Sequence, residues 1–187
     1  FENCVASGYD PKAMGEMFEN MVALRRFYGD NIPEFLLTHP ISSTRVSDAF
    51  NAADQLGDIG GIRNSIDYRL IKARLEADYE EPSINAIRIF ENKLSKNENI
   101  ENIFGYSRAL SLNGRFDESL LQIDKLLELY PKNLILNTSK IEILRESKEY
   151  DQALLQVNKQ LEVSPKNFPL TIETVSYTHL TLPTKVT

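Results

Sequence analysis

Cysteine and histidine, the residues that supply disulfide frameworks and most zinc sites, are scarce in this chain of 187 residues. The single cysteine, Cys4, cannot form an internal disulfide, and we expect it to be a small buried residue. The two histidines, His39 and His179, lie too far apart in sequence to form the His-x3-His pair of a zinc-binding helix. The sequence alone therefore gives no certain metal ligand.

The chain also has fewer basic than acidic residues, and it has no long apolar run. Lys and Arg number 21 against 27 Asp and Glu, and the formal net charge is −6. Because binding to a phosphate backbone needs clustered positive charge, we expect no nucleic-acid partner. No apolar run approaches the roughly 18 residues of a membrane helix, so we expect no membrane span in this segment.

Helix start and stop signals near the N-terminus indicate an all-α protein. Asp10-Pro11 is typical of a helix start, because Asp caps free N–H groups and Pro needs no donor there. A later helix begins at Ser42 or Ser43 and ends at Gly57. The predicted apolar faces comprise Met14, Met17, Phe18, Met21 and Leu24 in the earlier helix, and Val46, Ala49, Phe50, Ala53 and Leu56 in the later one.

The second half of the chain repeats itself with a period of 34 residues. The recurring residues have apolar or turn character: Gly114 and Lys148, Phe116 and Tyr150, Leu120 and Leu154, and Pro131 and Pro165. This period, with helix–turn–helix chemistry and a closing proline, resembles the tetratricopeptide repeat. Each helical pair in such an array exposes an apolar face that only a neighbouring pair can cover.

We expect four repeats of unequal quality. The first clear repeat pairs helices over 100–112 and 116–129, and the second occupies 134–157. A degenerate repeat with its first helix over 66–79 precedes them, and a truncated repeat begins at Phe168. The side chains expected to form the core are Ala86, Phe90, Ile103, Tyr106, Leu110, Ile123, Leu126, Ile141, Leu144, Ala153 and Val157.

Composition divides the chain into three parts. Three glycines between Gly57 and Gly61 predict a boundary, so we assign residues 1–60 and 61–174 to separate domains. Residues 175–187 show no helical period and resemble the translated read-through of a sequencing-library adapter. A natural tail rich in strand-forming residues is the alternative. His179 lies in this segment and is left out of the site.

Two segments of the first domain resemble a family of zinc metallopeptidases, the bacterial β-barrel assembly-enhancing proteases. They are Ala6-Ser-Gly-Tyr-Asp-Pro-Lys-Ala-Met14, and the loop Pro33-Glu-Phe-Leu-Leu-Thr-His-Pro-Ile41 with Arg45 and Val46 after it. The resemblance implies the end of a gluzincin-type metalloprotease domain followed by a tetratricopeptide-repeat solenoid. It also implies a periplasmic zinc metalloendopeptidase that takes part in outer-membrane protein assembly and quality control.

The family's zinc-binding residues are missing from this sequence. Neither the His-Glu-x-x-His helix nor the further Glu ligand is present. Since zinc hydrolysis needs three protein ligands and a general base, we expect the chain alone to be inactive. The chain begins at Phe1 without an initiator Met, and we expect it to be a piece of a longer protein whose principal zinc ligands lie upstream.

His39 is the residue with the most plausible chemistry here. Within the family resemblance it could stabilise an oxyanion, or occupy the open position of zinc as an auxiliary ligand that holds the enzyme off. The alternative is a histidine that only serves the turn before Pro40. Arg45 lies near a helix N-terminus, where a cation is unfavourable, so we expect a carboxylate partner; a solvated arginine is the alternative.

Two functions from different classes follow from the sequence. In the first, the chain is the C-terminal portion of the metalloprotease, and the repeat groove docks polypeptide substrates, protein partners or the outer-membrane assembly machinery. In the second, it is a non-enzymatic repeat adaptor whose N-terminal helices cap the stack. The proline-bounded loop around His39 favours the first, because a simple cap has no use for such a loop.

Overall fold

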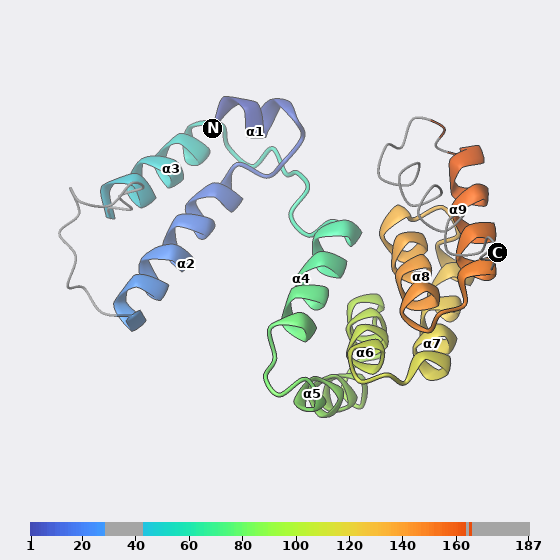
Figure 1. Ribbon diagram of the computed structural model, residues 1–187. Helices are drawn as coiled ribbons and strands as arrows, with labels where there is room; N and C mark the ends of the chain where they lie inside the picture. Colours follow the sequence, from blue (N-terminus) through green and yellow to red (C-terminus); the bar gives the residue numbers. More distant parts are fainter. Residues whose placement is uncertain (29–42, 164, 166–187) are drawn as a thin grey trace, which may run out of the picture. The chain divides into compact units, whose positions relative to one another are not determined.

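All the regular secondary structure in the described part of the chain is helical, as the sequence predicts. The computed structural model describes residues 1–28, 43–163 and 165. The chain divides into two units, Phe1–Ser65 and Ile66–Thr187, and each is described by itself (Figure 1). None of the described helices is both long and apolar enough to cross a membrane.

The first unit contains a short helix and a packed pair. These are α1 (Glu2–Ala6), α2 (Lys12–Tyr28) and α3 (Ser43–Gln55), and α2 lies against α3. Ala49 and Ala53 are buried on α3, as predicted, and their small side chains let the two helices approach closely. Gly15 on α2 serves the same purpose, because a Cβ there would lie 2.7 Å from the ring of Phe50.

Asp10 ties the start of α2 to the segment that follows α3. Its Oδ1 accepts a hydrogen bond from the backbone N–H of Lys12 at 2.8 Å, so the predicted N-cap is confirmed. Its Oδ2 accepts from Nε of Arg63 at 2.5 Å. The backbone N–H of Asp10 donates to the carbonyl of Ile62 at 3.2 Å, and Gly61 leaves room for this approach.

The second unit contains three successive helix pairs. They are α4 (Ile66–Asp78) with α5 (Ile84–Leu94), α6 (Ile100–Leu112) with α7 (Phe116–Leu129), and α8 (Leu134–Glu146) with α9 (Tyr150–Val163). The predicted helices over 100–112 and 116–129 are confirmed to the residue. The predicted helix over 66–79 ends one residue early.

The core of the second unit is centred on α6, which packs against α4, α5 and α7. Phe90 and Phe104 are almost fully buried there, together with Leu110, as predicted for Phe90 and Leu110. A Cβ on Gly105 would lie 2.0 Å from the ring of Phe90, so only glycine lets α5 approach α6 this closely. Ile103 and Tyr106, expected inside, are half-buried and pack against the edge of the core.

Three predictions in the first unit need correction. Cys4 is half-buried rather than buried, and it lies on α1, a helix of five residues none of which is buried. Met17 and Met21 are 47% and 38% exposed, and Leu56 is 44% exposed, although all three lie on predicted apolar faces. Met17 and Met21 lie on a part of the α2 apolar stripe that the rest of the unit leaves exposed, and Leu56 follows the end of α3.

Several predictions lie outside the described residues. They concern His39 and its loop, the repeat beginning at Phe168, and the segment 175–187 with His179. The predicted domain boundaries at 60 and 174 stay predictions.

The turn between the helices of each clear repeat requires a left-handed residue. Gly114 has φ +74° and Lys148, its equivalent, has φ +68°. The next residues, Arg115 and Glu149, donate backbone hydrogen bonds to Leu110 and Leu144 at 2.9 and 2.8 Å. A non-glycine residue is strained in this conformation, whereas glycine is not.

We therefore expect Lys148→Gly to raise the free energy of unfolding by about 1 kcal/mol, and Gly114→Lys to lower it by about the same amount. Urea denaturation followed by circular dichroism measures both. Lys125→Gly, in the interior of α7, is the control and should be destabilising by about 1 kcal/mol. A destabilised Lys148→Gly protein would contradict the account of this turn.

The Asp10 contacts also predict a pH dependence. The hydrogen bond from Arg63, then that from the Lys12 backbone, hold the pKa of Asp10 below its usual value despite some burial. A lowered pKa in the folded state gives stability that is present above the ordinary pKa of about 3.9 and is lost as pH falls below it. The protection of amides at the start of α2, measured as the exchange rate relative to that of the unfolded chain, should therefore fall below pH 4. Asp10→Asn, which keeps a capping oxygen, should lose most of that pH dependence; an unchanged profile would exclude Asp10 as its source.

Candidate functional site

Arg45, one of the two residues singled out in the sequence, lies in the first turn of α3 as predicted. Its guanidinium is 5.3 Å from the centroid of the Phe18 ring on α2, a cation–π distance. It borders a cavity of about 280 Å³ whose lining also includes Met14 and Asp48. The expected carboxylate partner stays a prediction, and His39 lies outside the described residues.

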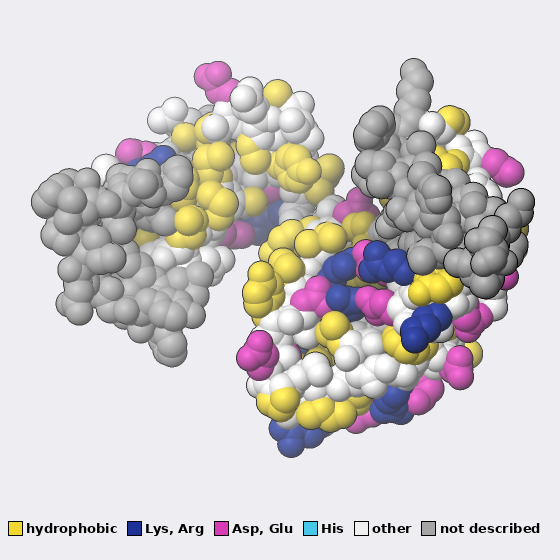
Figure 2. Space-filling model, viewed as in Figure 1, with side chains coloured by type: hydrophobic (Ala, Val, Ile, Leu, Met, Phe, Trp, Pro, Cys, Tyr) yellow, Lys and Arg dark blue, Asp and Glu magenta, His cyan; other side chains and the backbone are white. Residues whose placement is uncertain are grey.

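The largest group of functional-type side chains in the second unit is one that the sequence reasoning missed. Each repeat begins with one of the helices α4, α6 and α8. Charged and polar residues on these three helices pair with one another between helices. We call this set the ionic face; it comprises Arg69, Arg74, Asp78, Glu101, Arg108, Ser111, Glu142 and Glu146. Figure 2 looks onto a face of this unit on which Lys or Arg and Asp or Glu side chains lie side by side.

Arg74 links α4 to α8, two helix pairs further along the chain. Its Nη2 lies 3.0 Å from an oxygen of Glu142, and its Nε lies 3.5 Å from Asp78 one turn further along α4. The side chains of all three residues are about a quarter exposed. Partial burial protects such pairs from screening by salt better than exposed surface pairs.

Arg108 on α6 lies at the centre of the ionic face. Its Nε lies 2.6 Å from Asp78, and its Nη1 lies 3.6 Å from Glu146, which also accepts a 2.7 Å hydrogen bond from Ser111. Burial acts to lower the pKa of Arg108. The hydrogen bond to Asp78 and the charges of Glu146 and Glu142 outweigh burial and raise that pKa above its usual value. Arg108 is therefore held as a permanent cation between carboxylates of two other helices.

Further polar contacts join the same helices. Arg69 on α4 lies 3.1 Å from Glu101 on α6, and Asn133, the N-cap of α8, donates to Asp67 of α4 at 3.0 Å. Within the described residues, Nε of Arg69 and Oγ of Ser139 are buried without a hydrogen-bond partner. Ser139 borders a cavity of about 10 Å³ directly beneath the ionic face.

The repeat period could have revealed the ionic face. Arg74, Arg108 and Glu142 occupy equivalent positions at the 34-residue offset, one on each first helix. Equivalent residues of neighbouring repeats lie side by side in a stack, so charged residues at these positions predict that charges gather along the first helices, although not which of them pair. Only apolar and turn residues were compared at the 34-residue offset in the sequence analysis, and so these charged positions were not detected.

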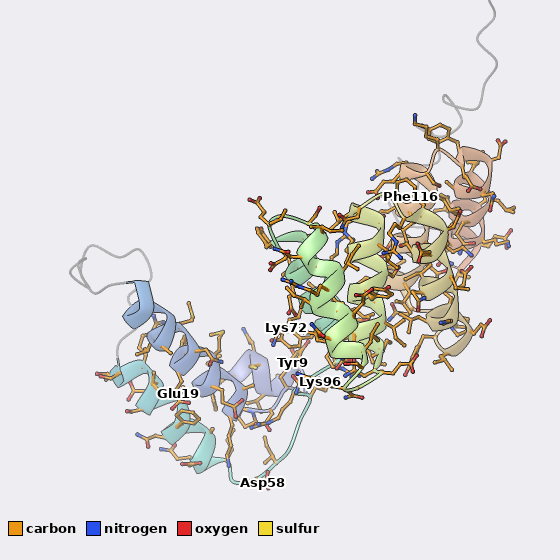
Figure 3. All side chains as sticks on the ribbon, turned by 90° about the horizontal axis from the view of Figure 1, so that it is seen from below. Tyr9, Glu19, Asp58, Lys72, Lys96 and Phe116 are labelled. Atoms are coloured by element: carbon orange, nitrogen blue, oxygen red, sulfur yellow. The ribbon has the colours of Figure 1, made fainter. Side chains whose placement is uncertain are left out.

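A row of exposed apolar side chains adjoins the ionic face on α4. Tyr68, Ile71 and Leu75, with Tyr79 directly after the end of the helix, follow at helical spacing and are 54%, 43%, 48% and 81% exposed. Figure 2 shows hydrophobic side chains gathered along this helix, and Figure 3 labels Lys72, which projects from the same helix. The combination of an apolar row with paired charges is typical of a protein-binding surface rather than of a catalytic centre.

The described residues do not form a zinc site. In residues 1–28, 43–163 and 165 no three His, Cys, Asp or Glu side chains come together in a way that could hold a metal ion. The carboxylates that do gather, Asp78, Glu142 and Glu146, are already paired with Arg74 and Arg108.

Comparison with known proteins supplies the family. No protein-family model matches the chain. The beta-barrel assembly-enhancing proteases of Escherichia coli (strain K12) and Shigella flexneri are each 32% identical to it over 130 residues, and that of Yersinia pestis is 31% identical over 131 residues.

The matched stretch makes up 68% of this chain and 26% of each relative, so the chain spans about a quarter of the length of the relatives that it matches. The similarity agrees with the resemblance found in the sequence. At family level, the chain therefore belongs with the beta-barrel assembly-enhancing proteases.

Proposed function

We propose that this chain is the C-terminal portion of a periplasmic zinc metalloendopeptidase, and that its second unit docks polypeptides destined for, or engaged in, outer-membrane β-barrel assembly. The observation that carries this proposal is the 32% identity over 130 residues with proteases named for that process. A protease that acts on assembling proteins needs a surface that binds incompletely folded chains.

The ionic face and the apolar row beside it have the chemistry for such docking. Strands of outer-membrane barrels alternate apolar and polar side chains, so an unfolded barrel protein presents both kinds at short intervals. Ile71 and Leu75 are available to bury the apolar residues of such a chain. The guanidiniums and carboxylates of the ionic face hold α4, α6 and α8 in place as a preformed surface, which lowers the entropy cost of binding.

Catalysis belongs, in this proposal, to the rest of the longer protein. Zinc would be held by ligands outside this chain and would supply a Lewis acid and an activated water. His39 would act on that centre, either as an oxyanion stabiliser or as a latch on the open zinc position, and Arg45 would meet a carboxylate of the catalytic domain.

We expect Ile71→Asp and Leu75→Asp each to weaken binding to a urea-unfolded, fluorophore-labelled outer-membrane barrel protein by at least about tenfold. That is the scale of one buried aliphatic side chain. Fluorescence anisotropy with the 187-residue chain measures the affinity, and circular dichroism checks that the variants fold.

Leu121→Asp is the matched control, because Leu121 lies on α7 outside the docking surface and is 58% exposed. Its affinity should be unchanged. An equal loss for all three variants would mean that binding depends on general surface hydrophobicity and not on α4.

In the full-length protein we expect His39→Ala to change the rate of proteolysis of the same barrel protein by at least about tenfold, the scale of one catalytic contact. Glu34→Ala, in the same loop, is the control and should leave the rate unchanged. Zinc content is measured by atomic absorption. A changed rate with unchanged zinc content would support a direct role for His39, whereas a changed rate with less zinc would mean that the variant has lost metal. A full-length protein without zinc and without proteolytic activity would instead support the adaptor function.

A further inference from the structure

A second surface depression lies between α7, α8 and α9. It has a volume of about 520 Å³, within the range of about 300–1,000 Å³ typical of ligand-binding clefts. Its lining includes three carboxamide side chains and charges of both signs: Asp124, Asn137, Lys140, Gln156, Lys159 and Gln160. We call it the amide groove.

The amide groove and the ionic face lie on opposite sides of α8. Glu142 and Glu146 pair with arginines of α4 and α6, whereas Lys140 pairs with Asp124 of α7 at 2.7 Å. Asn137, on the same side as Lys140, contacts α9 through Gln156. A ligand in the amide groove would therefore leave the ionic face free.

The carboxamide of Gln156 is held in a fixed orientation. It donates from Nε2 to Oδ1 of Asn137 at 2.9 Å. Asn137 is 2% exposed, and it donates from Nδ2 to the carbonyls of Pro131 and Asn133 at 3.0 and 2.8 Å. Asn137 thus has its hydrogen bonds satisfied and serves to position Gln156, while Gln160 follows one turn further along α9.

The charges of the amide groove do not favour an ion of either sign. Asp124 and Lys140 neutralise each other, and Glu128 on α7 is balanced by Lys159 on α9. Carboxamides offer a donor and an acceptor side by side, as a peptide group does. A neutral, amide-lined groove therefore matches the backbone of a polypeptide better than a phosphate or a metal ion.

The length of the groove fits a short stretch of chain. On α7 its wall runs from Asp124 to Glu128, about 6 Å at 1.5 Å per helical residue, and Pro131, beyond the end of the helix, extends it. An extended polypeptide advances by about 3.3 Å per residue, so about two to three residues fit. Leu127 and Pro131 on this wall provide apolar contact for their side chains.

We infer that the amide groove binds about two to three residues of an extended polypeptide, whose backbone N–H groups donate to, and whose carbonyls accept from, the carboxamides of Gln156 and Gln160, with little dependence on sequence. This inference rests on the proposed docking of polypeptides by the second unit and adds a separate binding surface to it. Binding that depends little on the ligand's amino-acid sequence suits a protein that binds many different unfolded chains.

The test uses a fluorescein-labelled peptide of seven alternating threonine and valine residues, and the same peptide with N-methylated backbone amides. Methylation keeps the side chains but removes the backbone donors. With the ¹⁵N-labelled 187-residue chain we expect the unmethylated peptide to shift the side-chain amide resonances of Gln156 and Gln160, and the methylated peptide to bind at least about tenfold more weakly.

Gln160→Ala should weaken binding of the unmethylated peptide about fivefold, the effect of one net hydrogen bond. Gln122→Ala is the matched control, because Gln122 is the equivalent of Gln156 in the preceding repeat and is not part of the groove lining. Its affinity should be unchanged. In the Ile71→Asp variant the peptide should still shift the side-chain amide resonances of Gln156 and Gln160 to the same extent.

Two results would overturn the inference. One is equal affinity for the methylated and unmethylated peptides. The other is binding that shifts resonances of α4 but not those of Gln156 and Gln160, which would leave the proposed docking on α4 intact. Loss of barrel-protein binding on Ile71→Asp, together with an unaffected peptide site, would support both surfaces independently.

Discussion

The second unit depends on the burial of a single helix, α6. It carries seven buried residues, and four of them, Gly105, Ser107, Ala109 and Ser111, are small. Small side chains let α4, α5 and α7 all approach the same helix, while Phe104 and Leu110 fill the space between them. Ser107 on α6 and Ser119 on α7 exchange hydrogen bonds with each other's carbonyls, so these buried hydroxyl groups are satisfied. Without this close packing, neither the ionic face nor the amide groove would have a rigid support.

Much of this fold could be predicted from the sequence, because its helices are delimited by local signals. Asp10 caps α2, Gly57 follows α3, and the left-handed turns at Gly114 and Lys148 separate the helices of each clear repeat. Such signals act through backbone conformation within a few residues, so they can be read without knowing the tertiary structure. The exposure of Met17 and Met21 could not be read in this way, since it depends on how much of α2 the partner helix covers.

The candidate site was less accessible to sequence reasoning. Arg74 and Glu142 are 68 positions apart, and only the packing of the helices brings them together. The repeat period aligns Arg74 and Glu142 with Arg108. That Arg74 and Glu142 form an ion pair follows only from the structure, in which the first helices of the repeats lie side by side. The family, in contrast, was evident from short motifs near the N-terminus, and the similarity to the beta-barrel assembly-enhancing proteases confirms it. The roles of His39 and Arg45 rest on that family and stay predictions.

The contacts between α4 and α8 have a consequence for how this unit unfolds. Stacked repeats normally interact only with their nearest neighbours, and such arrays can lose structure gradually from one end. Here Arg74 with Glu142, and Asp67 with Asn133, join the first helix pair to the third and pass over the second. A terminal pair cannot fray without breaking contacts beyond its neighbour. These two contacts therefore oppose the separation of a terminal pair from the rest of the stack.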